Sequence, residues 1–309
     1  MRNIKITGYG YSLPKHTVKF NDQTRYRLHS DENFMDYIED AVNKALTSSN
    51  TPKTDIDCII AGMATPLQAI PCNAALIHER VFIDTNIPAL DINTSCTSFV
   101  AALDMASYLI DAGRYNKVLI VSGDLASSAL NPNEKESYEL FSDVAVAFIV
   151  EATKEDRGII YSKQSTWSLG AHYTEIPKGG SLNTAFKMTG QNKKDYYFTM
   201  DGLKVAGFTL KKMTEFLEEA FANCSLKKEE INLIVPHQAS RILSVFMKKL
   251  GFKKEEYIDI VKDYGNMVSG SVPFALCIAL DQNLIKRGDN VALIGTAAGM
   301  SINFTLLKY

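Results

Sequence analysis

An internal repeat constrains the fold of this 309-residue chain more than any other feature of its sequence. Residues 34–46 carry apolar side chains at helical spacing, and an apolar strand segment follows at 56–61. The same order returns about 175 positions later, with a helical stripe at 213–221 and a strand segment at 231–235. The chain therefore contains at least one helix–strand unit twice.

Further segments of the repeat have the composition of buried elements. Residues 117–123 and 290–295 are continuous apolar runs, typical of strands covered on both faces. Between the repeated units lie 98–106 and 272–280, which are apolar on nearly every side. Helices of this kind belong in the middle of a large protein, so we expect both to be central.

Three elements recur in the same order at a nearly constant shift, which favours a true duplication over the helix–strand alternation of any α/β protein. A charged turn at 151–158 marks the join. We therefore predict an N-terminal half at 1–155 and a C-terminal half at 156–309. Residues 170–195 are rich in Gly, Lys, Thr and Asn and predict a long surface excursion near the site.

Composition excludes several classes of protein. The formal net charge of −2 provides no positive field for nucleic acid. No apolar run approaches the roughly 18 residues of a membrane-spanning helix, and the N-terminus resembles a strand, so a cytoplasmic location is expected. The five cysteines are widely spaced and form no CxxC pair, which favours neither a disulfide framework nor a metal site.

Cys96 lies at a predicted strand-to-helix turn, directly before the first central helix. Free N–H groups and the dipole at a helix N-terminus stabilise a thiolate and can bind an oxyanion. A lone cysteine usually fills a core, which suits Cys58 and Cys277 within their apolar runs. Cys96 is therefore the predicted nucleophile.

Two further polar residues lie in loops next to the repeated elements. His237 follows the strand segment 231–235, and ligands of open α/β sheets gather at such strand ends. Asn266 precedes the second central helix, opposite the Cys96 loop by the repeat. The alternatives are a structural histidine and an ordinary turn asparagine. Ala298 lies in a loop of small residues whose N–H groups are candidate oxyanion donors.

The order Thr94-Ser95-Cys96, Pro236-His237-Gln238-Ala239, Tyr264-Gly265-Asn266 and Gly295-Thr296-Ala297-Ala298-Gly299 resembles 3-oxoacyl-(acyl-carrier-protein) synthase III of the thiolase superfamily. The resemblance covers nearly the whole chain. It implies a thiolase-like, duplicated five-layer α-β-α-β-α fold. It also implies an acyltransferase of fatty-acid or specialised-metabolite biosynthesis that needs no metal or other cofactor.

The resemblance also implies a role for each residue. Cys96 takes an acyl group from a thioester of coenzyme A or acyl carrier protein. His237 and Asn266 then stabilise the enolate that forms as a malonyl- or 3-oxoacyl-type thioester reacts, and the N–H groups of Cys96 and Ala298 bind the oxyanion. The family works as a homodimer, in which Ile70 matches the position that reaches into the partner's acyl pocket.

Two segments depart from the family pattern. Residues 20–33 lack the Trp and the Arg-Thr-Gly with which the family holds coenzyme A, and 141–146 lack its Gly-Asp-Gly. The acyl donor is therefore open between coenzyme A and acyl carrier protein.

A basic edge lies on a predicted helix at 240–250, where Arg241, Lys248 and Lys249 could dock an acidic carrier protein. The alternative is a solvated helix with lysines at its C-terminus.

Two other functions use the same fold. The chain could pass an acyl group from Cys96 to a nucleophile other than malonate, or serve as a non-catalytic subunit of a heterodimer. The intact set of Cys96, His237 and Asn266 favours condensation. A papain-like hydrolase is disfavoured, because the helix after Cys96 lies inside a duplicated core.

Overall fold

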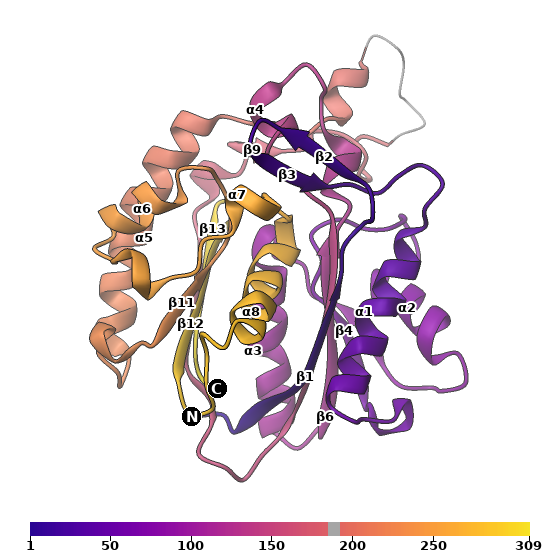
Figure 1. The fold of residues 1–309 in the computed structure, drawn as a ribbon, viewed down its shortest axis with the longest axis vertical. Coiled ribbons are helices and arrows are strands. Elements are labelled where there is room, and N and C mark those ends of the chain that lie inside the picture. Colours follow the sequence, from indigo (N-terminus) through magenta and orange to yellow (C-terminus); the bar gives the residue numbers. More distant parts are fainter. Residues whose placement is uncertain (185–191) are drawn as a thin grey trace.

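Two large β-sheets and three layers of helices form the body of the chain, of which the computed structural model describes residues 1–184 and 192–309. The helices that form the layers are α1 (Phe34–Ser48), α2 (Asn73–Phe82), α3 (Ser98–Asp111), α5 (Gly202–Asn223), α6 (Leu243–Lys249) and α8 (Ser271–Asp281). Figure 1 shows α1 and α2 outside the first sheet, α3 and α8 between the sheets, and α5 and α6 outside the second. The predicted five-layer fold is confirmed.

The two sheets share a common strand arrangement. The first has five strands, in the order β1 (Ile4–Ser12), β7 (Val144–Ala152), β6 (Lys117–Asp124), β4 (Cys58–Ala61) and β5 (Ala89–Asp91). The second has four, in the order β11 (Leu233–Pro236), β12 (Asn290–Ala297), β13 (Ser301–Lys308) and β8 (Gly158–Thr166). The parallel pair β4–β6 corresponds to β11–β12, and the antiparallel pair β6–β7 to β12–β13. The boundary between halves at 155 and 156 stays a prediction.

The central helix α8 is buried as its apolar surface predicts, and α3 is buried over most of its length, with Met105 and Tyr108 exposed. In α8 every residue from Ser271 to Leu280 is buried, because both sheets and α3 surround the helix. Phe274 is fully buried and meets the rings of Tyr11 and Tyr264 edge-on, with ring centroids 5.0 and 4.9 Å apart. This layer joins the two sheets in one core.

The turns that lead into α3 and α8 have the same hydrogen bonds. The Thr94 N–H donates to Ser98 Oγ over 3.0 Å, and the Met267 N–H donates to Ser271 Oγ over 2.9 Å. Each serine thus holds the turn before its own helix. The two halves therefore have equivalent hydrogen bonds at the start of each central helix.

The same two turns carry a matched pair of asparagines. Asn93 Oδ1 accepts from the Ser95 N–H, and Asn266 Oδ1 accepts from the Val268 N–H, both over 2.8 Å. Ser95 and Val268 both have positive φ, at 55° and 52°. Non-glycine residues rarely adopt this conformation, so it is held by the surrounding hydrogen bonds.

Some segments differ from the sequence-based expectations. The helix expected at 240–250 is confined to α6, because residues 239–242 form an irregular connection after β11. Within the predicted surface excursion at 170–195, β9 (Thr174–Glu175) pairs with β10 (Thr199–Met200), which lies just beyond it, and residues 185–191 lie outside the described part. Short elements complete the chain: β2 (Thr17–Phe20), β3 (Gln23–Tyr26), α4 (Lys135–Tyr138) and α7 (Val261–Tyr264). Within the described residues, no helix is long and apolar enough to cross a membrane.

Replacing Phe274 by Ala tests the central layer. The change leaves a cavity where close packing has no room to relax, so we expect the free energy of unfolding to fall by about 3–5 kcal/mol. Urea denaturation would measure the change, with Ile83→Ala as the control because Ile83 is 69% exposed. An equally small decrease in the free energy of unfolding in both variants would contradict a tightly packed central layer.

Candidate active site

Cys96, His237, Asn266 and Ala298 line a single cavity of about 310 Å³. They come from four separate segments: the turn before α3, the end of β11, the turn before α8, and the turn between β12 and β13. The structure therefore brings together the side chains that the sequence singled out.

Cys96 lies in a single turn of 3-10 helix, Ser95–Thr97, directly before α3. Burial raises the pKa of its thiol to about 11, and the nearby Asp124 acts in the same direction. Hydrogen bonds from Ser95 and from the Ala298 N–H oppose this rise in pKa without cancelling it. The expected stabilisation of a thiolate by N–H groups is therefore present, but burial outweighs it, and Cys96 is a neutral thiol at neutral pH in the free protein.

His237 follows directly after β11, where its N–H donates to the Ile294 carbonyl over 2.8 Å. The side chain is buried, and burial lowers the pKa of the imidazole to about 4. Its Nδ1 atom has no hydrogen-bond partner among the described residues. His237 is thus a neutral imidazole at neutral pH, with hydrogen-bonding capacity that the described side chains leave unused.

Asn266 is held through its backbone and its side chain. Its N–H donates to the Leu140 carbonyl over 3.0 Å, and its carbonyl accepts from the Ser142 N–H over 2.9 Å. Its Nδ2 donates to the Ala239 carbonyl over 3.2 Å. An amide NH₂ has two N–H groups, so one remains for a ligand in the cavity.

Each of the two turns is also tied to the opposite sheet. Asp124, at the end of β6, accepts from Ser269 Oγ over 2.5 Å, in the same turn as Asn266. Asn303, on β13, donates to Thr97 Oγ1 over 2.5 Å, next to Cys96. Sequence reasoning missed these residues.

Sequence reasoning also missed the role of Asn93, although the repeat places it at the position equivalent to Asn266. No local pattern marks Asp124 or Asn303, whose partners are distant in the sequence.

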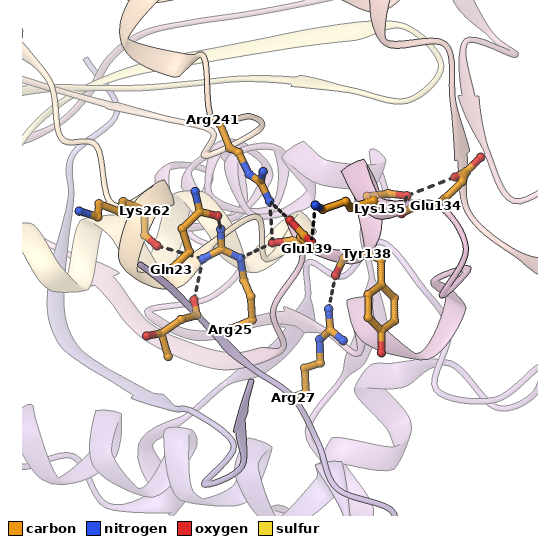
Figure 2. Close-up of polar contacts among 11 residues, drawn as sticks. Gln23, Arg25, Arg27, Glu134, Lys135, Tyr138, Glu139, Arg241 and Lys262 are labelled. Carbon is orange, nitrogen blue, oxygen red and sulfur yellow. Dashed lines mark hydrogen bonds and ion pairs between the residues drawn. The ribbon is translucent and has the colours of Figure 1, made fainter. Parts of the chain in front are cut away.

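The remaining predicted residues lie outside this cavity. Arg241 donates to the Glu139 backbone carbonyl and to its Oε2, over 3.3 and 3.2 Å (Figure 2). Lys248 and Lys249 are exposed at the end of α6, and Ile70 is 84% exposed. In the predicted basic edge, Arg241 is thus hydrogen-bonded to Glu139, whereas Lys248 and Lys249 are exposed to solvent.

A second cavity of about 670 Å³ lies between α5 and α6 and shares Met200, Val205, His237, Ala239 and Thr296 with the first. Thr209 Oγ1 lines it and has no hydrogen-bond partner among the described residues. The described residues contain no cluster of three or more His, Cys, Asp or Glu side chains that could hold a metal ion.

A duplicated five-layer fold that brings a cysteine, a histidine and an asparagine to one cavity defines a thiolase-like condensing enzyme. Residues 90–167 match the family described as 3-oxoacyl-[acyl-carrier-protein (ACP)] synthase III, and residues 221–309 match its C-terminal part. The beta-ketoacyl-[acyl-carrier-protein] synthase III of Clostridium perfringens is 32% identical over 100% of both chains. The chain belongs to the 3-oxoacyl-(acyl-carrier-protein) synthase III family and is an acyltransferase.

Solved structures agree with this assignment. The beta-ketoacyl-[acyl-carrier-protein] synthase III of Thermus thermophilus is 26% identical, with a TM-score of 0.85 and 98% of both chains covered. The priming beta-ketosynthase of the R1128 polyketide biosynthetic pathway is 21% identical and shares the fold, with a TM-score of 0.87 over 99% of this chain and 96% of the other.

The lowered pKa of His237 predicts a specific response to acid. The imidazole titrates at about 4 when folded and at about 6.5 when unfolded, so between these values the unfolded chain binds the extra proton. The free energy of unfolding should therefore decrease as the pH falls from about 6.5 to about 4, by up to about 3 kcal/mol. His237→Asn should remove this contribution. Urea denaturation from pH 7 to 4.5 would measure the free energy of unfolding of the wild type and of His237→Asn. The same dependence on pH in both proteins would contradict a buried neutral imidazole.

Proposed function

We propose that this chain joins an acyl group to a malonyl-type thioester through an acyl-Cys96 intermediate. In the first step Cys96 Sγ attacks the carbonyl carbon of an acyl thioester, and the donor thiol leaves with the proton that the cysteine gives up. The N–H groups of Cys96 and Ala298 receive the oxyanion of the tetrahedral intermediate. The product of this step is an acyl thioester on Cys96.

In the second step a malonyl-type thioester loses carbon dioxide. The electrons of the broken C–C bond form an enolate, whose oxygen accepts hydrogen bonds from His237 and from the free N–H of Asn266. The enolate carbon attacks the acyl-Cys96 carbonyl, and Cys96 leaves as a thiolate that takes up a proton. Two neutral donors suit this step, because they stabilise negative charge that exists only on the reaction path.

The observation that carries this proposal is the meeting of Cys96, His237, Asn266 and Ala298 around one cavity. The cavity continues between apolar side chains, among them Leu130, which suit an acyl chain on Cys96. The second cavity begins at His237 and suits the thioester arm of the incoming substrate.

The partners belong to the same proposal. We infer a homodimer, with the exposed Ile70 at the partner's acyl pocket, and a cytoplasmic location. Coenzyme A or acyl carrier protein carries the substrates, and an acidic carrier docks against Arg241, Lys248 and Lys249. The two alternative functions lack a supporting observation of their own, since simple acyl transfer has no need of Asn266 and a non-catalytic subunit has no need of Cys96.

Substitutions in the triad separate the two steps. Cys96→Ala should abolish acylation, because no sulfur remains to form the thioester. His237→Ala and Asn266→Ala should keep acylation but slow decarboxylation by about 100-fold or more, the usual effect of removing a donor to a developing oxyanion. Intact-mass spectrometry would follow acylation, and release of labelled carbon dioxide would follow decarboxylation. An acylated wild-type protein that releases no carbon dioxide would favour simple acyl transfer.

Charge reversal tests carrier docking. Lys248→Glu combined with Lys249→Glu should raise KM for a carrier-bound malonyl group by about 10-fold, because attraction to an acidic partner becomes repulsion. KM for malonyl-coenzyme A should change little. Lys53→Glu, at an exposed position in the N-terminal part of the chain, is the control. An equal change for both substrates would contradict a carrier-specific surface.

A further inference from the structure

Arg25, at the centre of β3, is a fully buried arginine. Its guanidinium donates four hydrogen bonds, and none of the four acceptors is a carboxylate (Figure 2). The acceptors are the backbone carbonyls of Glu139 (2.9 Å), Lys262 (3.0 Å) and Thr24 (2.6 Å), and Gln23 Oε1 (2.7 Å). A buried charge without a direct counter-ion is costly, so a specific need must retain it.

Two of these carbonyls belong to the segments that hold Asn266. Glu139 directly precedes Leu140, whose carbonyl accepts from the Asn266 N–H over 3.0 Å. Lys262 lies in α7, which ends at Tyr264, two residues before Asn266. Arg25 therefore links the backbone at 139–140, which holds the Asn266 N–H, to the backbone of α7, which leads into Asn266.

Arg25 also packs directly against the residue before Asn266. A Cβ added to Gly265 would lie 2.8 Å from both Cδ and Nε of Arg25, and 2.2 Å from the Leu140 carbonyl oxygen. Gly265 also has a positive φ of 75°, which side-chain-bearing residues rarely adopt. The guanidinium thus supports the turn that aims the Asn266 side chain.

The chemistry of arginine suits this task. Its planar head has five N–H donors in a fixed fork, so one side chain can bridge carbonyls from three segments. Burial lowers the pKa of Arg25 to about 10, with Arg241 and Arg27 contributing, so the group stays protonated at neutral pH. A lysine ammonium could not reach the same set of acceptors in the same plane.

We propose that Arg25 is a positioning residue, which sets the Asn266 amide for the decarboxylation step and has no part in the acylation of Cys96. The proposal rests on the proposed role of Asn266. It predicts that the two half-reactions respond differently to changes at Arg25, which a general loss of stability would not produce.

The test uses Arg25→Lys and Arg25→Met in the full-length protein. Acetyl-coenzyme A, or another acyl-coenzyme A that acylates the wild type, serves as donor, and labelled malonyl-coenzyme A or malonyl carrier protein as the second substrate. We expect folded variants to acylate Cys96 within about threefold of the wild-type rate. Decarboxylation by the acylated protein should slow by about 100-fold, the effect of a catalytic group displaced by about 1 Å.

Arg27→Met is the matched control. Arg27 is also a buried arginine, but it lies over the rings of Phe20 and Tyr138. It donates to the Tyr138 carbonyl (Figure 2), and within the described residues its side chain makes no hydrogen bond to 262–266. The Arg27→Met variant should keep the wild-type rates of both acylation and decarboxylation. The double variant of Arg25→Lys with Asn266→Ala should be no slower in decarboxylation than Asn266→Ala alone, since Arg25 acts through Asn266.

Additive losses in the double variant would overturn the proposal, as would a folded Arg25 variant with normal decarboxylation or with both half-reactions equally impaired. If neither Arg25 variant folds, Gln23→Leu removes one acceptor of Arg25 and keeps the guanidinium. It should reduce decarboxylation selectively, and equal rates to wild type would then overturn the inference. Absence of carbon dioxide release from acylated wild-type protein would contradict the proposed function itself.

Discussion

The rest of the structure depends on the close approach of two turns, one at the start of α3 and one at the start of α8. The turns contact each other, and each is hydrogen-bonded by a side chain of the opposite sheet: Asp124 holds Ser269, and Asn303 holds Thr97. Because the first turns of both helices are buried between the sheets, neither turn can shift without disturbing the core. Cys96 and Asn266 thereby acquire fixed positions at the wall of one cavity.

Burial decides the charge states of Cys96 and His237. The Cys96 thiol and the His237 imidazole are both uncharged at neutral pH, because removal from water raises the pKa of one and lowers that of the other. The site therefore presents hydrogen-bond donors and a neutral thiol. Such a site favours chemistry in which charge appears on the reaction path, as it does when a thioester enolate forms.

Much of the architecture could be predicted from periodicity. The apolar surfaces of 98–106 and 272–280 indicated central helices, and the repeat indicated two similar sheets. The helix expected at 240–250 was too long, because helical spacing alone does not show where an irregular connection ends. Burial also outweighed the expected effect of N–H groups on the pKa of Cys96, since the depth of a side chain depends on packing.

The sequence by itself determined the duplication and most of the helix and strand types, because these follow from local periodicity. From the chemistry of single residues it also predicted the side chains that line the cavity. Only the tertiary structure decided which polar residues hold the site. Arg25, Asp124 and Asn303 form their bonds with segments more than a hundred residues away in the chain. The physical reason is that hydrogen bonds between distant segments leave no periodic trace, and they exist only once the core has packed.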